Sequence, residues 1–152
     1  MIRSFRRCIH SKQCESTTFK HHQWKFYEST VIKDKQSKFQ SRHVDLTSSD
    51  QIPLILQALV DENKAMAKAS HPHMIAWRVE KNGTIDLGFK DNGEKGAGSL
   101  LLDLLIKYDL KNILIICTRW YGGKPIGGAR FRHIKASALQ SLKIGDKISR
   151  SG

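Results

Sequence analysis

Apolar positions in the first half of the chain recur with the period of an α-helix from residue 52 onward. They share one predicted face and are Ile52, Ile55, Leu56, Leu59, Val60 and Met66. Ser48 or Ser49 supplies the N-cap, and Pro53 is tolerated in the first turn. Because His71-Pro72 stops the pattern, the spacing predicts one amphipathic helix before residue 71.

Other apolar runs have the composition and alternation of strands. Two predicted hairpins have turns at residues 33–38 and at Asn82-Gly83, a dipeptide that two-residue hairpin turns prefer. Ile113–Cys117 is an unbroken apolar run, typical of a strand covered on both faces in the middle of a sheet. The predicted strands are Trp24–Ile32, Phe39–Leu46, Met74–Glu80, Thr84–Phe89 and Ile113–Cys117.

Two more helices complete the predicted order of elements. Leucines fill the segment Ser99–Tyr108, and Phe131, Ile134, Ala138 and Leu142 recur at helical spacing within Ala129–Leu142. The order strand, strand, helix, strand, strand, helix, strand, helix predicts an α+β two-layer sandwich. We expect a mixed sheet with the helices on one face.

Length and charge limit the classes of protein. At 152 residues the chain fits one domain, and no window approaches the roughly 18 consecutive apolar residues of a membrane-spanning helix. The formal net charge of +12 favours association with polyanions or acidic surfaces. We divide the chain into a basic leader over residues 1–22, a domain over residues 23–145 and a tail over residues 146–152.

The leader has two interpretations. Its cations, Arg3, Arg6, Arg7, Lys12 and Lys20, are accompanied by one acid, Glu15. Ile2, Phe5 and Ile9 near helical spacing would suit the amphipathic helix of a mitochondrial presequence, whereas the alternative is a solvated, disordered tail. We expect a cytoplasmic protein, with mitochondrial targeting through residues 1–22 as the alternative.

The cysteines and histidines do not predict a metal centre or a nucleophile. Cys8, Cys14 and Cys117 include no C-x-x-C spacing, and Cys117 is expected to be an inaccessible core residue. His71 and His73 lack a third ligand at a suitable spacing. We therefore expect no metal, no cofactor and no Ser-His-Asp or Cys-His catalytic set.

The most informative segment follows the predicted central strand. Arg119, Trp120 and Tyr121 lie at the strand end, and Gly122, Gly123, Gly127 and Gly128 then allow sharp turns. No acid occurs from Lys111 to Lys143. Trp120 and Tyr121 either stack on an unpaired base or anchor a protein partner, or they close the sheet end as ordinary core.

Two glycine-preceded helix starts, near Ser99 and Ala129, have the backbone amides and dipole of anion sites. A phosphate loop is not predicted, since Lys124 is followed by Pro125 and no G-K-S or G-K-T occurs. Asp91 and Glu94, on the upstream glycine loop, are placed to oppose Arg119 or Arg130. The arginines would stabilise the ionised carboxylates, which disfavours a general acid or base there.

Four motifs in order resemble the Impact family. They are Thr118–Gly123 followed by G-x-x-R-F-x-H-I ending at Ile134, the acidic and glycine-rich Asp91–Ser99, Ser37–Gln40, and Lys68–His71 followed by Ala76–Arg78. The resemblance runs from about Trp24 to about Leu142. It implies the architecture of the second domain of small-subunit ribosomal protein S-five, with the left-handed crossover known for that fold.

The resemblance also implies a function. Eukaryotic Impact proteins bind the ribosome-associated co-activator of the kinase that phosphorylates initiation factor two alpha, and so restrain that kinase in the amino-acid starvation response. Those regulators carry an additional RWD domain, which we do not expect before Trp24. The bacterial YigZ-related members also lack it, and resemblance to them, together with the basic segment, favours RNA or DNA binding as an alternative.

We therefore predict a non-catalytic regulatory binding protein with a ribosome-associated partner and no membrane partner. The expected partner or anion-binding residues lie together on one docking surface. They are Asp91, Glu94, Arg119, Trp120, Tyr121, Arg130, Arg132 and His133.

Overall fold

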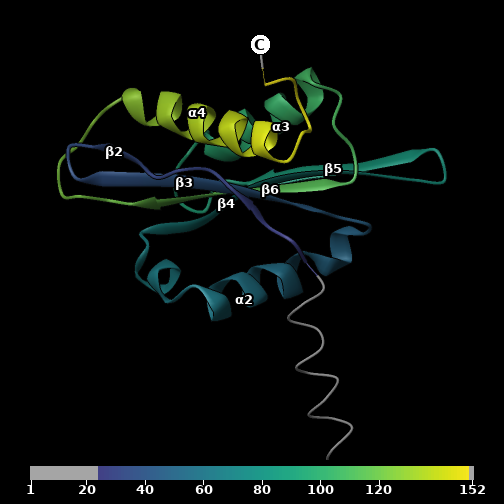
Figure 1. The fold of residues 1–152 in the computed structure, drawn as a ribbon, viewed down its shortest axis with the longest axis horizontal. Helices are drawn as coiled ribbons and strands as arrows, with labels where there is room; N and C mark the ends of the chain where they lie inside the picture. The colour runs from purple at the N-terminus through teal and green to yellow at the C-terminus, as the bar shows by residue number, and fades with distance from the viewer. Residues whose placement is uncertain (1–23, 151–152) are drawn as a thin grey trace, which may run out of the picture.

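A computed structural model describes residues 24–150 (Figure 1). The predicted leader over residues 1–22 lies outside the described residues. Within residues 24–150, six strands and three α-helices follow one another with two short 3-10 segments. In chain order they are β1 Tyr27–Glu28, β2 Ile32–Asp34, β3 Ser37–Asp45, η1 Ser49–Gln51, α2 Ile52–Glu62, η2 Lys64–Lys68, β4 His71–Lys81, β5 Thr84–Lys90, α3 Ala97–Lys107, β6 Ile113–Trp120 and α4 Ala129–Ile144.

The strands form one sheet in the order β1-β3-β6-β4-β5, and β2 also pairs with β3. The apolar strand β6 lies at the centre, as its composition predicts. The expected mixed sheet is wrong, because every strand pair in the described sheet is antiparallel. The connection through α2 places β4, and the connection through α3 places β6, antiparallel to the strands beside them.

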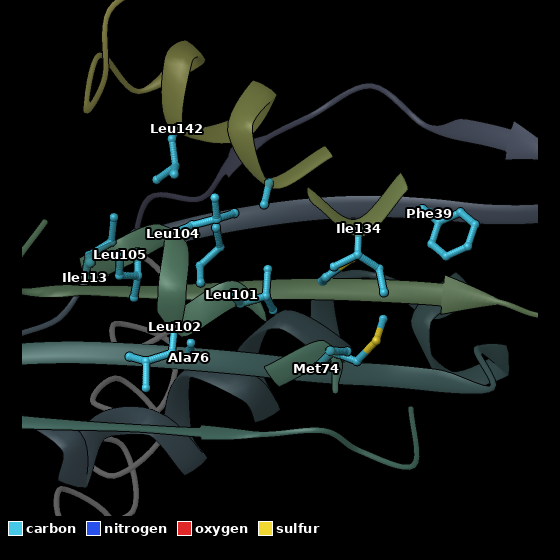
Figure 2. Packing of buried hydrophobic residues seen from close by; sticks show 14 residues of the cluster. Phe39, Met74, Ala76, Leu101, Leu102, Leu104, Leu105, Ile113, Ile134 and Leu142 are labelled. Carbon is cyan, nitrogen blue, oxygen red and sulfur yellow. The ribbon is translucent and has the colours of Figure 1, made fainter. Parts of the chain in front are cut away.

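The helices α3 and α4 cover one face of the sheet (Figure 1). Figure 2 shows the core beneath them, where Leu101 and Leu105 of α3, Ile134 of α4 and Ile113 of β6 belong to one buried cluster. All four side chains are fully shielded from solvent. Burying an aliphatic side chain of this size contributes about 1.5 to 3 kcal/mol, so this layer is a main source of stability.

The α+β class is confirmed, but the expectation that all helices share one face is wrong for α2. This helix lies on the opposite face in Figure 1, with Ile55 and Leu59 packed against Leu114 and Ile116 of β6. Successive side chains of a strand point to opposite faces, so the apolar run of β6 supplies a core to both. A strand that is apolar at every position thus requires cover on two sides.

Element boundaries differ most around α2. The helix ends at Glu62, because Asn63 has the extended angles φ −130 and ψ 91. Met66, expected on the helix, is buried instead from the 3-10 segment η2. The Asn82-Gly83 hairpin is confirmed, with positive φ of 54 and 79 at its two turn residues, as a type I′ turn requires.

The first predicted strand is divided into β1 and β2, which both pair with β3. Strand β6 is longer than predicted and continues to Trp120. After α4, Ile148 still packs against the core of the α3 and α4 face. Within residues 24–150 no helix is long and apolar enough to cross a membrane.

Candidate functional site

A buried carboxylate between two guanidinium groups marks one end of the sheet. Glu94 Oε2 lies 2.6 Å from Arg119 Nη1, and Glu94 Oε1 lies 2.7 Å from Arg130 Nε. His71 Nε2 is 3.6 Å from the same Oε2. We call Glu94, Arg119, Arg130 and His71 the Glu94 cluster. It joins the loop before α3, the end of β6, the start of α4 and the start of β4.

Arg119 is the most deeply placed member. It points from β6 toward the α3 and α4 face, where its guanidinium lies 5.2 Å from the Phe39 ring centroid and 5.3 Å from that of Tyr121. Its Nη2 reaches Ser37 Oγ at 3.5 Å, and only 6% of its side chain is exposed. Arg119 therefore supports the site from below, while Tyr121, 48% exposed, forms its surface.

The glycine turn after β6 is held against two serines. Tyr121 N donates to Ser70 Oγ at 2.9 Å, and Gly122 N donates to Ser37 Oγ at 3.1 Å. A side chain at residue 122 would collide with the backbone of Gln36, so the close approach requires glycine. These contacts fix where the chain leaves the sheet and where Tyr121 points.

The loop Asp91–Gly96 presents Glu94 to the cluster by capping α3. Asp91 Oδ1 accepts a hydrogen bond from Gly98 N at 2.8 Å, which satisfies a free amide of the first helical turn. Gly96 has φ +93, a left-handed conformation that glycine adopts without strain. Asp91 thus positions the loop, and Glu94 makes the contacts with arginine.

His71 and His73 are held by the same loop. His71 Nδ1 donates to the Asn92 carbonyl at 3.0 Å, and His73 N donates to Asn92 Oδ1 at 2.9 Å. Burial lowers the pKa of His73 below 6.5. No group of three or more His, Cys, Asp or Glu side chains within residues 24–150 is arranged to hold a metal ion. His71 belongs to the Glu94 cluster instead.

The first turns of α4 place three predicted residues differently. Arg130 reaches inward to Glu94 and stacks 4.4 Å above the Phe131 ring centroid. Arg132 is exposed to solvent. His133 Nε2 contacts Asp34 Oδ2 at 2.7 Å, which ties α4 to β2. Only Arg132 is free to meet a partner without breaking a contact.

Trp120 is separated from the docking surface expected from the sequence. Because β6 continues through Trp120, Arg119 and Trp120 point to opposite faces of the sheet. Trp120 packs with the α2 core and donates to Ala65 O at 2.9 Å. It lines a cavity of about 320 Å³ with Lys38 and Arg42. The alternation of a strand, carried three residues beyond Cys117, would have predicted this separation.

Comparison with known protein families matches the part of the chain that contains the Glu94 cluster. The sequence profile of the Impact N-terminal domain matches residues 35–142, a range that contains every member of the Glu94 cluster. The chain belongs to the Impact family.

Relatives in this family differ in length. The IMPACT family member YDL177C of Saccharomyces cerevisiae is 40% identical, and the match covers 78% of this chain and 90% of that protein. The IMPACT homolog of Dictyostelium discoideum is 39% identical over 78% of this chain but 34% of its own length. Protein IMPACT of Mus musculus is 37% identical over 73% of this chain and 35% of its own length. The chain thus spans about a third of the two larger relatives.

Two solved structures share the Impact fold. The crystal structure of a hypothetical protein has a TM-score of 0.65 at 25% identity, covering 76% of this chain and 56% of that one. The structure of the two-domain translational regulator Yih1 has a TM-score of 0.51 at 34% identity, covering 77% of this chain and 45% of that one.

Within this Impact domain, three of the predicted site residues meet directly in the Glu94 cluster, and Tyr121 stacks on its arginine. The residues predicted from the sequence for this site did not include Ser37 and His71, which contact Arg119 and Glu94 respectively. Both lie in motifs that resemble the family, Ser37–Gln40 and Lys68–His71, so the motif positions carried a signal that spacing alone did not.

The Impact site carries more positive than negative charge. Two guanidinium groups face one carboxylate, which leaves a net positive charge beside the exposed Tyr121 ring. Each carboxylate oxygen of Glu94 is held in an ion pair with one arginine. The thiol of Cys117 is fully buried, and burial raises its pKa to about 11. The arrangement suits binding of an anionic group.

Proposed function

We propose that this Impact domain is a non-catalytic regulator of translation that docks on a ribosome-associated protein. The observation that carries the proposal is the juxtaposition of Tyr121, exposed and stacked on a cation, with the positive Glu94 cluster and the free Arg132. Aromatic and arginine side chains dominate the energy of protein interfaces. We name Asp91, Glu94, Tyr121, Arg130 and Arg132 the docking face.

Rigidity supports a docking role. The Glu94 cluster fastens four separate segments together, and Asp91 caps the helix that follows the loop. A face whose side chains are already fixed loses less conformational entropy when a partner binds. The partner chemistry that fits is an acidic segment carrying an apolar side chain, which would meet the arginines and Tyr121 respectively.

The finer part of the proposal concerns the pathway. Yih1, which shares this fold, is described as a translational regulator. By resemblance, the partner is the ribosome-associated co-activator of the starvation kinase, and docking would restrain that kinase. The family resemblance and the fold shared with Yih1 support this assignment, and a binding experiment tests it.

The test is capture of partners from extracts of amino-acid-starved cells with the full chain as bait, followed by mass spectrometry. We expect recovery of the co-activator or of ribosomal proteins, and strong loss of both with Tyr121→Ala or Arg132→Ala. Tyr108→Ala is the matched control, because Tyr108 is 39% exposed at the opposite end of α3 from the Glu94 cluster. Recovery of neither partner, or equal recovery with Tyr121→Ala and wild type, would contradict the proposal.

Direct RNA or DNA binding is the second candidate. The observation favouring it is the absence of acids from Lys111 to Lys143, a segment whose exposed cations include Lys124, Arg132 and Lys135. Binding to phosphates releases counterions, so affinity should fall steeply with salt. Arg132→Ala should reduce the slope of log affinity against log salt by about one unit. An affinity independent of salt would exclude this candidate.

An enzymatic role that requires a nucleotide is tested by measuring the melting temperature with nucleotides present. A nucleotide that binds only the native protein must raise its melting temperature. We expect ATP, GTP and NAD to leave the melting temperature unchanged, and a concentration-dependent rise with any of them would contradict the non-catalytic assignment.

A further inference from the structure

Strand β5 has an unpaired outer edge within the described sheet. The Asn82-Gly83 turn closes with the pair Lys81 and Thr84, which in a two-residue hairpin exchange hydrogen bonds. Hydrogen-bonded and non-bonded pairs then alternate along the hairpin. The backbone amides and carbonyls of Ile85, Leu87 and Phe89 therefore point away from β4, toward the open edge.

The same three residues carry an exposed apolar stripe. They are paired with Glu80, Arg78 and Ala76 of β4, and their side chains lie on the α3 and α4 face. Ile85 is 37% exposed, Leu87 45% and Phe89 44%. Open backbone groups and apolar side chains thus coincide at the same three positions.

Two of the usual protections of an edge strand are missing here. Natural edges are blocked by proline, by bulges or by charged side chains, and the charged side chains of β5, Asp86 and Lys90, lie on the face opposite the apolar stripe. Thr84–Lys90 contains no proline, and its pairing with β4 runs without a register shift. A straight edge of seven residues with an apolar stripe is a template for another strand.

We propose that β5 pairs with β5 of a second copy of this chain, antiparallel and around a two-fold axis at Leu87. In this register Leu87 lies opposite its own copy, and Ile85 of each chain lies opposite Phe89 of the other. All of these are hydrogen-bonded positions, so the open amides and carbonyls are satisfied reciprocally. The apolar stripe continues unbroken across the join.

Charge complementarity selects a second copy over an unrelated strand. On the opposite face of β5, the same register places Asp86 across from Gly88 of the other chain and diagonal to both Lys90 and Asp86 of that chain. Diagonal neighbours in a sheet are within reach of a long side chain. Each two-fold join therefore allows two Asp86–Lys90 ion pairs, one on each side of the axis, against a single Asp86–Asp86 diagonal at the axis.

The pairing goes beyond the proposed function and does not depend on it. Each copy contributes a complete docking face, because the residues of that face and the Glu94 cluster that holds them come from a single chain. A dimer would bring two such faces to one assembly, which raises avidity for a partner with repeated sites.

Sedimentation equilibrium of the full chain tests the proposal from micromolar to millimolar concentration, with reductant present because the sequence contains Cys8 and Cys14. We expect the mass to rise from 17.3 kDa toward twice that value. Leu87→Lys places like charges opposite each other and should raise the dissociation constant about tenfold or more. Leu54→Lys is the matched control, since Leu54 is 56% exposed on α2, away from the edge.

Pairing of Leu87 with its own copy makes one further prediction, which an interface without that pairing would not make. Leu87→Glu alone should also be monomeric, but an equal mixture of Leu87→Lys and Leu87→Glu proteins should form heterodimers, because position 87 meets itself. Circular dichroism establishes that both variants are folded. A wild-type protein that stays monomeric throughout, a Leu54→Lys defect as large as that of Leu87→Lys, or a mixture without heterodimers would each overturn the proposal.

Discussion

Glu94 and Arg119 form an ion pair of 2.6 Å in which the two side chains are only 8% and 6% exposed. Removing one partner of such a pair leaves a buried charge uncompensated. We expect Glu94→Gln to lower the free energy of unfolding by about 3 kcal/mol, because Arg119 keeps its place between Phe39 and Tyr121 but loses its counter-ion. Urea denaturation followed by circular dichroism measures the change.

The matched control for this substitution is Glu80→Gln. Glu80 pairs with Lys111 at 3.0 Å, but both side chains are largely open to solvent, at 42% and 37%. Screening by water should leave the unfolding midpoint of this variant close to that of wild type. Equal effects of the two glutamine variants would show that the Glu94 pair is not a buried interaction.

The sequence predicts opposite charges at this end of the sheet, but it does not say which residues meet. Asp91 and Glu94 are both candidates for Arg119 and Arg130 from spacing alone. The structure separates their roles because the loop must also cap α3, a task that Asp91 performs through Gly98 N. Three-dimensional closure of the loop, rather than local pattern, assigns Glu94 to the arginines.

The sequence predicts the type and position along the chain of elements with strong periodicity. It does not predict which face of the sheet a helix covers. The central strand and the helix α4 follow from apolar spacing, since burial imposes that spacing. The face occupied by α2 does not follow, because an amphipathic helix packs equally well on either side of a strand that is apolar throughout. The end of α2 at Glu62 depends on the extended backbone of Asn63, a change of conformation that the apolar periodicity does not record.

Gly122 should tolerate no side chain. A Cβ there would collide with the Gln36 carbonyl and lie 2.6 Å from Ser37 N, which are backbone atoms that cannot move aside cheaply. We expect Gly122→Ala to lower the free energy of unfolding by about 1 to 3 kcal/mol. At Gly128, with φ −66 and open space around it, alanine should change stability by less than about 1 kcal/mol. Thermal denaturation of the two variants side by side tests the difference.

His43 should make stability depend on pH. Ser141 Oγ donates to Tyr27 O, so His43 Nδ1 donates to Ser141 Oγ at 2.9 Å and leaves Nε2 buried without a partner. Burial, reinforced by repulsion from Lys147, lowers the pKa of His43 from 6.5 to about 4. The unfolded chain therefore binds this proton first, and stability should be full above pH 6.5 and fall as the pH drops from 6.5 toward 4.

The expected loss attributable to His43 is up to about 3 kcal/mol at the acid end of this range. Urea midpoints at a series of pH values measure it. His43→Asn removes the titration while keeping a donor toward Ser141, so its stability should be lower at neutral pH but flatter toward acid. An unchanged slope in this variant would assign the pH dependence to other groups.

Cys117 should be chemically silent in the native protein. Its side chain is fully buried at the centre of β6, within 3.8 Å of Ser137 Oγ, and burial raises the pKa of the thiol to about 11. Thiolate is the reactive form, so both access and ionisation oppose modification. With Cys8 and Cys14 replaced by serine, we expect no reaction of the native chain with a thiol reagent and complete reaction in denaturant, measured by mass spectrometry. Rapid labelling under native conditions would mean that β6 opens locally, since no static path reaches the sulfur.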